Sequence, residues 1–236
     1  MYNILVWKRG DTMHGNNGFC QVAFMRCEST FECGAEAISA LPFGEVEKER
    51  LAKIKNDVAR RNSFCALLCL ESLLRGRGVD ASSTDLTIVR SENGKPHFSS
   101  LPFHFSISHS KDLCAVALSD SSIGIDVEFA NTGKDILAIS ERFFALEEHL
   151  KISQSNSHEE DFLLTWTKKE ALAKLSGLGL SSICSRKLPQ SSAYNFKCYR
   201  LELDEQIAYL SLCSEREIKH LEYDKNKEIT LYEIQN

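Results

Sequence analysis

The sequence lacks the features that would place it in several specialised classes of protein. Its 236 residues contain no C-x-x-C pair, no excess of basic residues and no basic-then-apolar segment at the N-terminus. The most apolar helical segment, Phe64 to Leu74, is interrupted by Glu71 and is too short to cross a bilayer. We therefore expect no signal peptide, no membrane partner and a cytoplasmic location.

The charge and the cysteines exclude further possibilities. The net charge is −5, from 28 basic and 33 acidic residues, so the broad basic surface of a nucleic-acid-binding protein is not expected. The nine cysteines are odd in number, and Cys65 and Cys69 lie at helical spacing in an apolar segment. These features indicate buried, reduced thiols rather than a disulfide framework or a zinc site.

The hydrophobic periodicity predicts an α+β fold. Strands are expected at 2–7, 20–25, 86–90, 103–107, 113–118, 123–129, 194–203, 206–213 and 228–233, and helices at 45–55, 57–74, 133–152 and 159–175. Each half thus combines helices with a small antiparallel set of strands. We expect two similar lobes, residues 1–110 and 111–236, that form one pseudo-twofold unit and act as a monomer.

The most informative stretch is Gly124 to Glu128. Asp126 and Glu128 alternate with apolar residues, and residues two apart in a strand point to the same face. Two neighbouring carboxylates on one rigid face favour a cation between them, and Mg²⁺ is a hard cation that takes oxygen ligands. A solvated acidic strand would show the same pattern, so a metal site requires a third ligand.

The helix expected at 159–175 offers that ligand. Glu170 and Lys174 lie four residues apart and share a helix face, and Trp166 lies one turn earlier, where it can brace the helix against the core. Taken alone, the Glu–Lys pair is better explained by a solvated helix surface. Three carboxylates and a lysine together suit phosphoryl chemistry, in which Mg²⁺ bridges phosphate oxygens and lysine offsets the developing charge.

Several motifs together resemble those of a known family. They are Gly94-Lys95-Pro96, Ser106-Ile107-Ser108-His109-Ser110, the stretch Gly124 to Glu128, Arg142-Phe143-Phe144 through Glu148, and Trp166 to Leu180 with its Lys169-Glu170-Ala171 centre. Their order and spacing resemble the 4′-phosphopantetheinyl transferases of the long, two-lobed, surfactin-type class, over about residues 45–180. The resemblance implies this family's fold, with the active site between the lobes.

The resemblance also implies an activity. The family transfers the 4′-phosphopantetheine arm of coenzyme A to a serine of an apo acyl or peptidyl carrier protein and releases 3′,5′-ADP. The carrier protein and its pathway, which in this family is fatty-acid, polyketide or nonribosomal-peptide biosynthesis, stay open. Attack of a hydroxyl on a pyrophosphate needs alignment, charge neutralisation and removal of one proton, and it needs no covalent enzyme intermediate.

Residue roles follow from the resemblance as expectations. Asp126, Glu128 and Glu170 would hold Mg²⁺, with Mn²⁺ as an alternative. Glu170, Lys174 and His109 would act at the reacting phosphate, with Glu170 as general base directly or through water. Coenzyme A contacts are expected from Lys48, Arg61 (with Arg60 an equal candidate), Lys95, Ser108, His109 and Lys174. Glu148 matches a family acidic position, although a helix N-terminal Glu that favours the macrodipole explains it equally well.

Two other functions would use some of the same residues. A non-catalytic module that binds coenzyme A or a carrier protein would tolerate losses among Asp126, Glu128, Glu170 and Lys174, and all four are present. A metal-dependent nuclease would use similar carboxylates, but it would need a broad basic groove, which the net charge of −5 disfavours.

Overall fold

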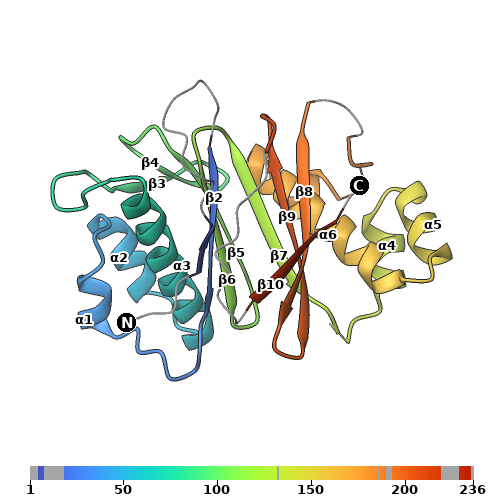
Figure 1. Cartoon of the computed structure of the whole chain (residues 1–236), viewed down its shortest axis with the longest axis horizontal. Coiled ribbons are helices and arrows are strands. Elements are labelled where there is room, and N and C mark those ends of the chain that lie inside the picture. The colour runs from blue at the N-terminus through green and yellow to red at the C-terminus, as the bar shows by residue number, and fades with distance from the viewer. Residues whose placement is uncertain are drawn as a thin grey trace. The chain divides into compact units, whose positions relative to one another are not determined.

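The structure is a computed structural model that describes residues 19–131, 133–184, 186–189, 193–218 and 229–234, and the backbone of 5–7. The chain forms two compact units that meet in sequence between Ser122 and Ile123, and each is described by itself (Figure 1). The boundary lies later than residue 110 because the strand that follows residue 110 pairs inside the first unit. Residues 10–18, which separate the strands expected at 2–7 and 20–25, lie outside the described residues.

The first unit contains an antiparallel sheet and three helices. The sheet has the strand order β1-β2-β6-β5, and a separate hairpin pairs β3 with β4. The strands are β1 (Leu5–Trp7), β2 (Cys20–Arg26), β3 (Ile88–Arg90), β4 (Pro96–Phe98), β5 (His104–Ser110) and β6 (Leu113–Ser119). The helices are α1 (Ala35–Ser39), α2 (Glu45–Ala52) and α3 (Asp57–Gly76), and α3 lies against the sheet (Figure 1).

Helix α3 shows how local sequence sets an element. Its N-cap is Asn56, whose side chain accepts a hydrogen bond from the Ala59 amide at 2.9 Å. Its apolar stripe, which includes Phe64, Leu67, Leu70 and Leu74, is buried in the core of the unit. All nine cysteines are free thiols in the structure, and eight of them are buried, as the sequence predicted for most of these side chains.

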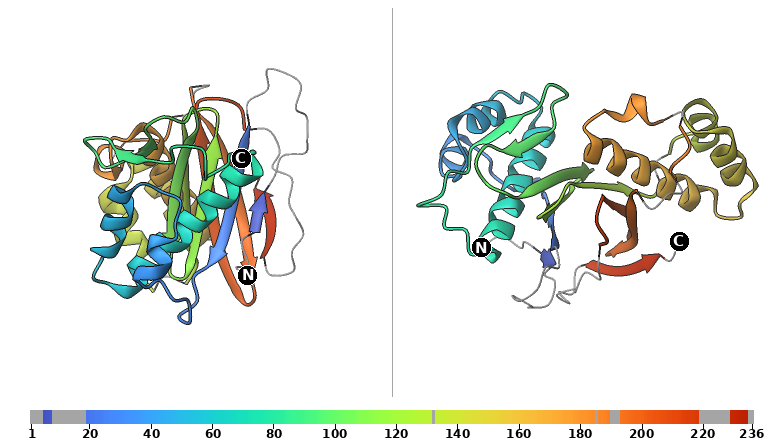
Figure 2. Two further views of the ribbon diagram at one scale, coloured as in Figure 1. Left: turned by 90° about the vertical axis from the view of Figure 1, so that its left-hand side faces the viewer. Right: turned by 90° about the horizontal axis from the view of Figure 1, so that it is seen from above.

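The second unit contains a sheet of order β10-β8-β9-β7, all antiparallel. The strands are β7 (Ile123–Phe129), β8 (Asn195–Leu203), β9 (Gln206–Ser214) and β10 (Ile229–Ile234). The helices are α4 (Ile136–Phe143), α5 (Leu146–Gln154), α6 (His158–Ser176) and the 3₁₀ turn η1 (Leu180–Ser182). In the right-hand view of Figure 2, α6 lies along the sheet and α4 and α5 lie beyond it. The predicted α+β class is confirmed, and none of the described helices is long and apolar enough to cross a bilayer.

Helix α6 is held against the rest of its unit from two sides. Trp166 packs against Phe144 and Phe162, with ring centroids 6.2 and 5.9 Å apart, which confirms the predicted bracing role of Trp166. On the sheet side, the Thr167 and Ser211 hydroxyls are 2.8 Å apart in the buried interior. The position and rotation of α6 relative to β7 and β9 are therefore tightly determined.

Candidate active site

Helix α6 and strand β7 approach each other most closely at Gly124. A Cβ atom built on Gly124 would lie 1.9 Å from the Ala171 carbonyl oxygen and 2.8 Å from the Leu175 amide nitrogen. Because residues alternate along a strand, Asp126 and Glu128 lie on the same face of β7 as Gly124, the face that meets α6. The glycine thus permits the helix to come close enough for its side chains to reach the strand carboxylates.

Lys174 and Asp126 form the direct contact between the two elements. The Lys174 ammonium donates to Asp126 Oδ1 at 2.8 Å, and the Asp126 side chain is only 6% exposed. The sequence spacing had also allowed Lys174 to pair with Glu170 on its own helix. The ion pair that forms joins the helix to the strand, because a poorly solvated carboxylate gains more from a cation than one with access to water.

Glu170 has an unusual environment. Its pKa is raised from 4.5 to about 7, chiefly by burial and also by the negative charges of Asp126 and Glu128, while the positive charge of Lys174 lowers it. These shifts require that Glu170 lie within electrostatic reach of all three residues. The four residues singled out by the sequence therefore act on one another in the second unit.

The donor set fits a hard divalent cation in its chemistry. Burial, together with the charges of Asp126 and Glu128, raises the pKa of Glu170 to about 7, and a bound cation would replace the proton that Glu170 holds below that pH. Within the described ranges, no three His, Cys, Asp or Glu side chains are grouped as a ready-made metal site. The Lys174 ammonium lies on one oxygen of Asp126.

Lys169, the neighbour of Glu170 on α6, is fully buried and makes three hydrogen bonds. Its ammonium contacts Glu148 Oε2 at 2.8 Å and the Cys184 carbonyl at 3.0 Å, and it also donates to the Arg186 carbonyl. All three donors of the ammonium are thereby used. Sequence reasoning did not assign this role to Lys169. The available signal was that its same-face neighbours at i+3 and i+4, Leu172 and Ala173, are apolar.

Glu148 completes this buried network. Its carboxylate accepts hydrogen bonds from the Ala145 amide at 3.1 Å and from the Leu188 amide at 2.8 Å, in addition to Lys169. The sequence had left a family acidic position and a helix N-terminal role open for Glu148. The contact with Ala145 is an N-terminal helix interaction, and the contacts with Lys169 and Leu188 tie α5 and the segment after η1 to α6.

Two of the predicted coenzyme A contacts lie on β5 of the first unit. Ser108 is buried, whereas His109 is exposed, as expected for consecutive residues that point to opposite faces of a strand. His109 pairs with Cys114 of β6 in the sheet register. The exposed imidazole is the one of these two side chains that can meet a ligand in solvent without rearrangement.

The two arginine candidates on α3 differ in their contacts. Arg60 is engaged by Asp57 at 2.5 Å and by the Ile54 carbonyl at 3.0 Å. Arg61 has a buried Nε atom with no hydrogen-bond partner among the residues that the structure describes. A buried, unsatisfied donor of a guanidinium is costly without a ligand. The structure thus distinguishes two positions that the sequence left equal.

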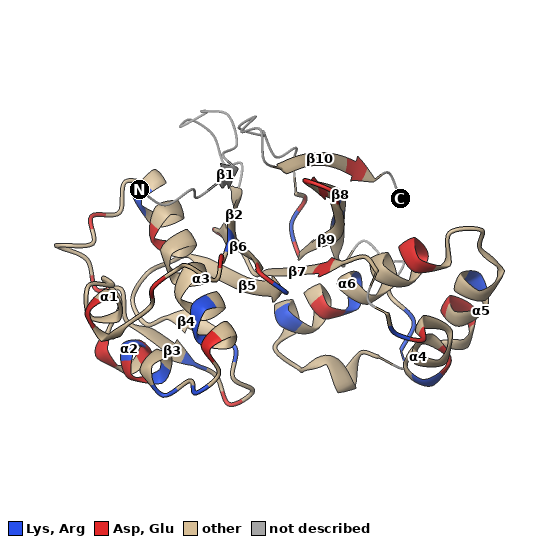
Figure 3. Cartoon of the chain, turned by 90° about the horizontal axis from the view of Figure 1, so that it is seen from below, with Lys and Arg blue, Asp and Glu red and all other residues tan. Residues whose placement is uncertain are grey.

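The two lysine candidates lie on neighbouring elements of the first unit. Lys48 is on α2, along which acidic and basic residues alternate (Figure 3), and its ammonium pairs with Glu45 at 3.1 Å. Lys95 follows Gly94 at the tip of the β3–β4 hairpin. Helix α2 and strand β3 are in contact, so both lysines belong to one region of this unit.

The second unit thus combines carboxylates and a lysine on a facing strand and helix, and one of these carboxyls, Glu170, has its pKa raised to about 7. Residues 122–231 match the model of the 4′-phosphopantetheinyl transferase superfamily. A Haemophilus influenzae protein, provisionally named a 4′-phosphopantetheinyl transferase, is 30% identical over 74% of this chain and 80% of its own length. The chain belongs to this superfamily.

Two further relatives carry the same name. The 4′-phosphopantetheinyl transferase psf-1 of Bacillus pumilus is 41% identical over 38% of this chain and 39% of its own length. The 4′-phosphopantetheinyl transferase gsp of Aneurinibacillus migulanus is 36% identical over 57% of each chain. The match therefore spans less than half of psf-1 and little more than half of gsp. The family predicted from the motifs is confirmed.

Proposed function

We propose that this chain transfers the 4′-phosphopantetheine arm of coenzyme A to a serine hydroxyl of an apo acyl or peptidyl carrier protein and releases 3′,5′-ADP. Membership of the superfamily supports the reaction class. The observation that carries the proposal is the placement of Glu170, with its pKa raised to about 7, beside Asp126 and Lys174.

The residues of the second unit supply the proton transfer and the charge stabilisation. Glu170 takes the proton of the attacking serine, directly or through water, and a base is most effective when its pKa is close to the working pH. Lys174 stabilises the charge on the departing 3′,5′-ADP phosphate as the P–O bond breaks. The serine oxygen displaces this group directly, so no cysteine needs a covalent role.

Asp126, Glu128 and Glu170 would hold Mg²⁺, or Mn²⁺ in its place. When bound, the metal supplies positive charge at the pyrophosphate oxygens. The chain supplies three carboxylates in mutual electrostatic reach, one of which exchanges a proton near neutral pH. In this arrangement Lys174 would contact two anions, Asp126 and the substrate phosphate.

Residues of the first unit are proposed to bind coenzyme A. They are Lys48, Arg61, Lys95, Ser108 and His109. Arg61 is preferred to Arg60 because Arg60 is already engaged by Asp57, whereas the Arg61 Nε lacks a partner within the described residues. The exposed His109 imidazole is offered to a phosphate of coenzyme A, and Ser108 contributes its hydroxyl from the same strand.

The setting of the reaction follows from its components. The proposed base and metal ligands all come from one chain, so a monomer suffices. The free thiols agree with a reducing compartment, and we propose that the protein acts in the cytoplasm. The natural carrier protein, whether of fatty-acid, polyketide or nonribosomal-peptide synthesis, is left to experiment.

The decisive experiment is a transfer assay read by mass. The chain is incubated with coenzyme A, Mg²⁺ and an apo acyl or apo peptidyl carrier, and the carrier is weighed intact. We expect a gain of one phosphopantetheine arm, and no gain for a carrier whose acceptor serine is changed to alanine. If no carrier of several types gains mass while the chain still binds coenzyme A, the binding-module alternative becomes the better explanation.

The raised pKa of Glu170 predicts the pH dependence. Below about pH 7 the carboxyl is protonated and can neither accept a proton nor bind a metal well, so kcat/KM should rise with pH through that region. More Mg²⁺ should move the midpoint to lower pH, because the cation favours the carboxylate. Glu160→Gln, on the same helix, should leave the profile unchanged. A profile that is flat from pH 5 to 8 at limiting Mg²⁺ would argue against Glu170 as base and ligand.

A further inference from the structure

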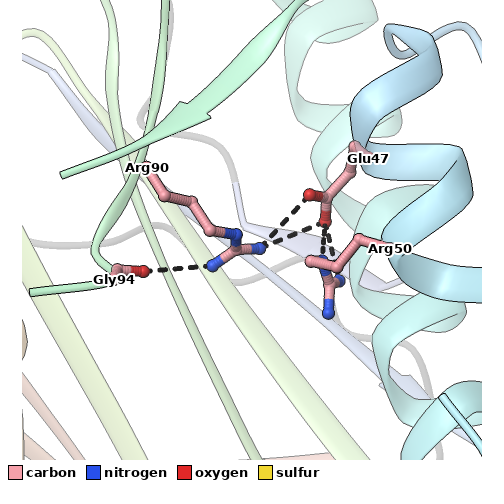
Figure 4. Close-up of polar contacts among 4 residues, drawn as sticks. All are labelled: Glu47, Arg50, Arg90 and Gly94. Carbon is pink, nitrogen blue, oxygen red and sulfur yellow. Dashed lines mark hydrogen bonds and ion pairs between the residues drawn. The ribbon is translucent and has the colours of Figure 1, made fainter. Parts of the chain in front are cut away.

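Glu47 of α2 is a buried carboxylate that joins two arginines (Figure 4). Its side chain is 4% exposed. Arg50, one turn along the same helix, donates to Glu47 Oε1 from Nε at 2.9 Å and from a terminal nitrogen at 2.7 Å. Arg90 of β3 donates to both carboxylate oxygens, at 3.2 and 3.3 Å. A single carboxylate thus fixes two guanidinium groups from different elements.

Arg90 also reaches the turn of its own hairpin. Its other terminal nitrogen donates to the Gly94 carbonyl at 3.1 Å (Figure 4). Two backbone hydrogen bonds close the turn. The Gly94 amide donates to the Ser91 carbonyl at 2.8 Å, and the Ser91 amide donates to the Lys95 carbonyl at 3.0 Å. Gly94 has φ +82°, which glycine adopts without strain. Arg90 therefore connects Glu47 to the turn that carries Lys95.

A second contact holds α2 against the same region. A Cβ atom built on Gly44, the N-cap of α2, would lie 3.0 Å from Thr87 Oγ1 and 3.4 Å from Thr87 Cα, just before β3 begins. Helix α2 is thus attached to the β3–β4 segment at Gly44 and again, one turn later, at Glu47. Two attachment points limit both the distance and the rotation between the helix and the hairpin.

We propose that Glu47 and Arg90 are positioning residues for coenzyme A: their bridge sets Lys48 of α2 and Lys95 of the hairpin at a fixed separation for its phosphates. This inference rests on the proposed function. The negative charge of Glu47 alone opposes the binding of a polyanion. Its contribution is therefore geometric, and it holds together elements whose cations would otherwise repel one another.

Loss of the Glu47 charge and loss of the bridge should change the affinity for coenzyme A in opposite directions, so one variant can separate the two effects. Glu47→Gln removes one negative charge from α2, and so does the matched control Glu49→Gln, at an exposed residue that pairs with Lys53. If charge alone mattered, both variants would bind coenzyme A as tightly as the native chain or more tightly. The bridge predicts that Glu47→Gln weakens the binding of coenzyme A and 3′,5′-ADP about tenfold in calorimetry, and that Glu49→Gln does not.

A second variant keeps the test decisive if Glu47→Gln does not fold. Arg90→Lys retains the charge but loses the planar fork that holds Glu47 and the Gly94 carbonyl together, and the Arg90 side chain is 36% exposed. We expect a similar loss of affinity, with kcat at saturating coenzyme A within about twofold of the native value. Undiminished affinity in Arg90→Lys or in folded Glu47→Gln would overturn the proposal. Failure of the native chain itself to bind coenzyme A would instead remove the proposed function.

Discussion

Glu170→Gln and Asp126→Asn should each lower the rate of phosphopantetheine transfer by about 10²–10⁴-fold. Glutamine cannot accept the proton of the serine, and it is a poor ligand for a hard cation. Asparagine at 126 keeps the shape of the side chain but removes the charge that holds Lys174 at 2.8 Å. The measurement is the initial rate of carrier modification at saturating coenzyme A and Mg²⁺, with Glu160→Gln as the control on the same helix.

The stability of Glu170→Gln distinguishes lost chemistry from lost structure. Because the folded state raises the Glu170 pKa from 4.5 to about 7, it binds this proton more tightly than the unfolded state does. The free energy of unfolding of the metal-free protein therefore falls as pH rises from about 4.5 through 7. Metal-free Glu170→Gln should consequently melt above the native chain at pH 8 and close to it at pH 4. Full transfer activity in both Glu170→Gln and Asp126→Asn would refute the proposed site.

Gly124→Ala is expected to destabilise the second unit and to abolish transfer. The new methyl group would lie 1.9 Å from the Ala171 carbonyl oxygen, a backbone atom that can move only with α6. Overpacking of this kind typically costs about 1–3 kcal/mol or more. The shift of α6 would also separate Lys174 from Asp126 and move Glu170 away from the strand.

The comparison for this variant is another glycine-to-alanine change. A Cβ atom on Gly34, which has φ −71°, would meet nothing within 4 Å. Gly34→Ala should therefore leave both the melting temperature and the transfer rate unchanged, whereas Gly124→Ala should lower both. Native-like melting and activity in Gly124→Ala would show that the helix and the strand do not need this close approach.

Most of the helices and strands could be predicted from local sequence patterns. The alternation from Ile123 to Phe129 predicted β7 with its bounds, and the helix expected at 57–74 corresponds to α3, Asp57–Gly76. Helix α6 was predicted within one residue at each end, and its C-cap is Gly177 at φ +69°. Helix α1 was not predicted, because a helix of five residues with one buried side chain is too short to show a hydrophobic periodicity.

The candidate site was only partly predictable. Spacing alone placed Asp126 and Glu128 on one strand face and Glu170 and Lys174 on one helix face. Spacing did not show that Lys174 would contact Asp126, 48 residues away, or that Lys169 would be buried against Glu148. Periodicity describes which residues of one element share a face, whereas a contact between elements depends on how they pack.

The sequence by itself determined the class of fold, the caps and turns, and the carboxylates and cations on which the chemistry depends, because each of these follows from interactions between residues near one another in the chain. Only the tertiary structure decided how the ions are paired. Burial made Asp126 the partner of Lys174, raised the pKa of Glu170 and joined Glu47 to Arg90 across 43 residues, because the strength of a charge interaction depends on the water that packing removes.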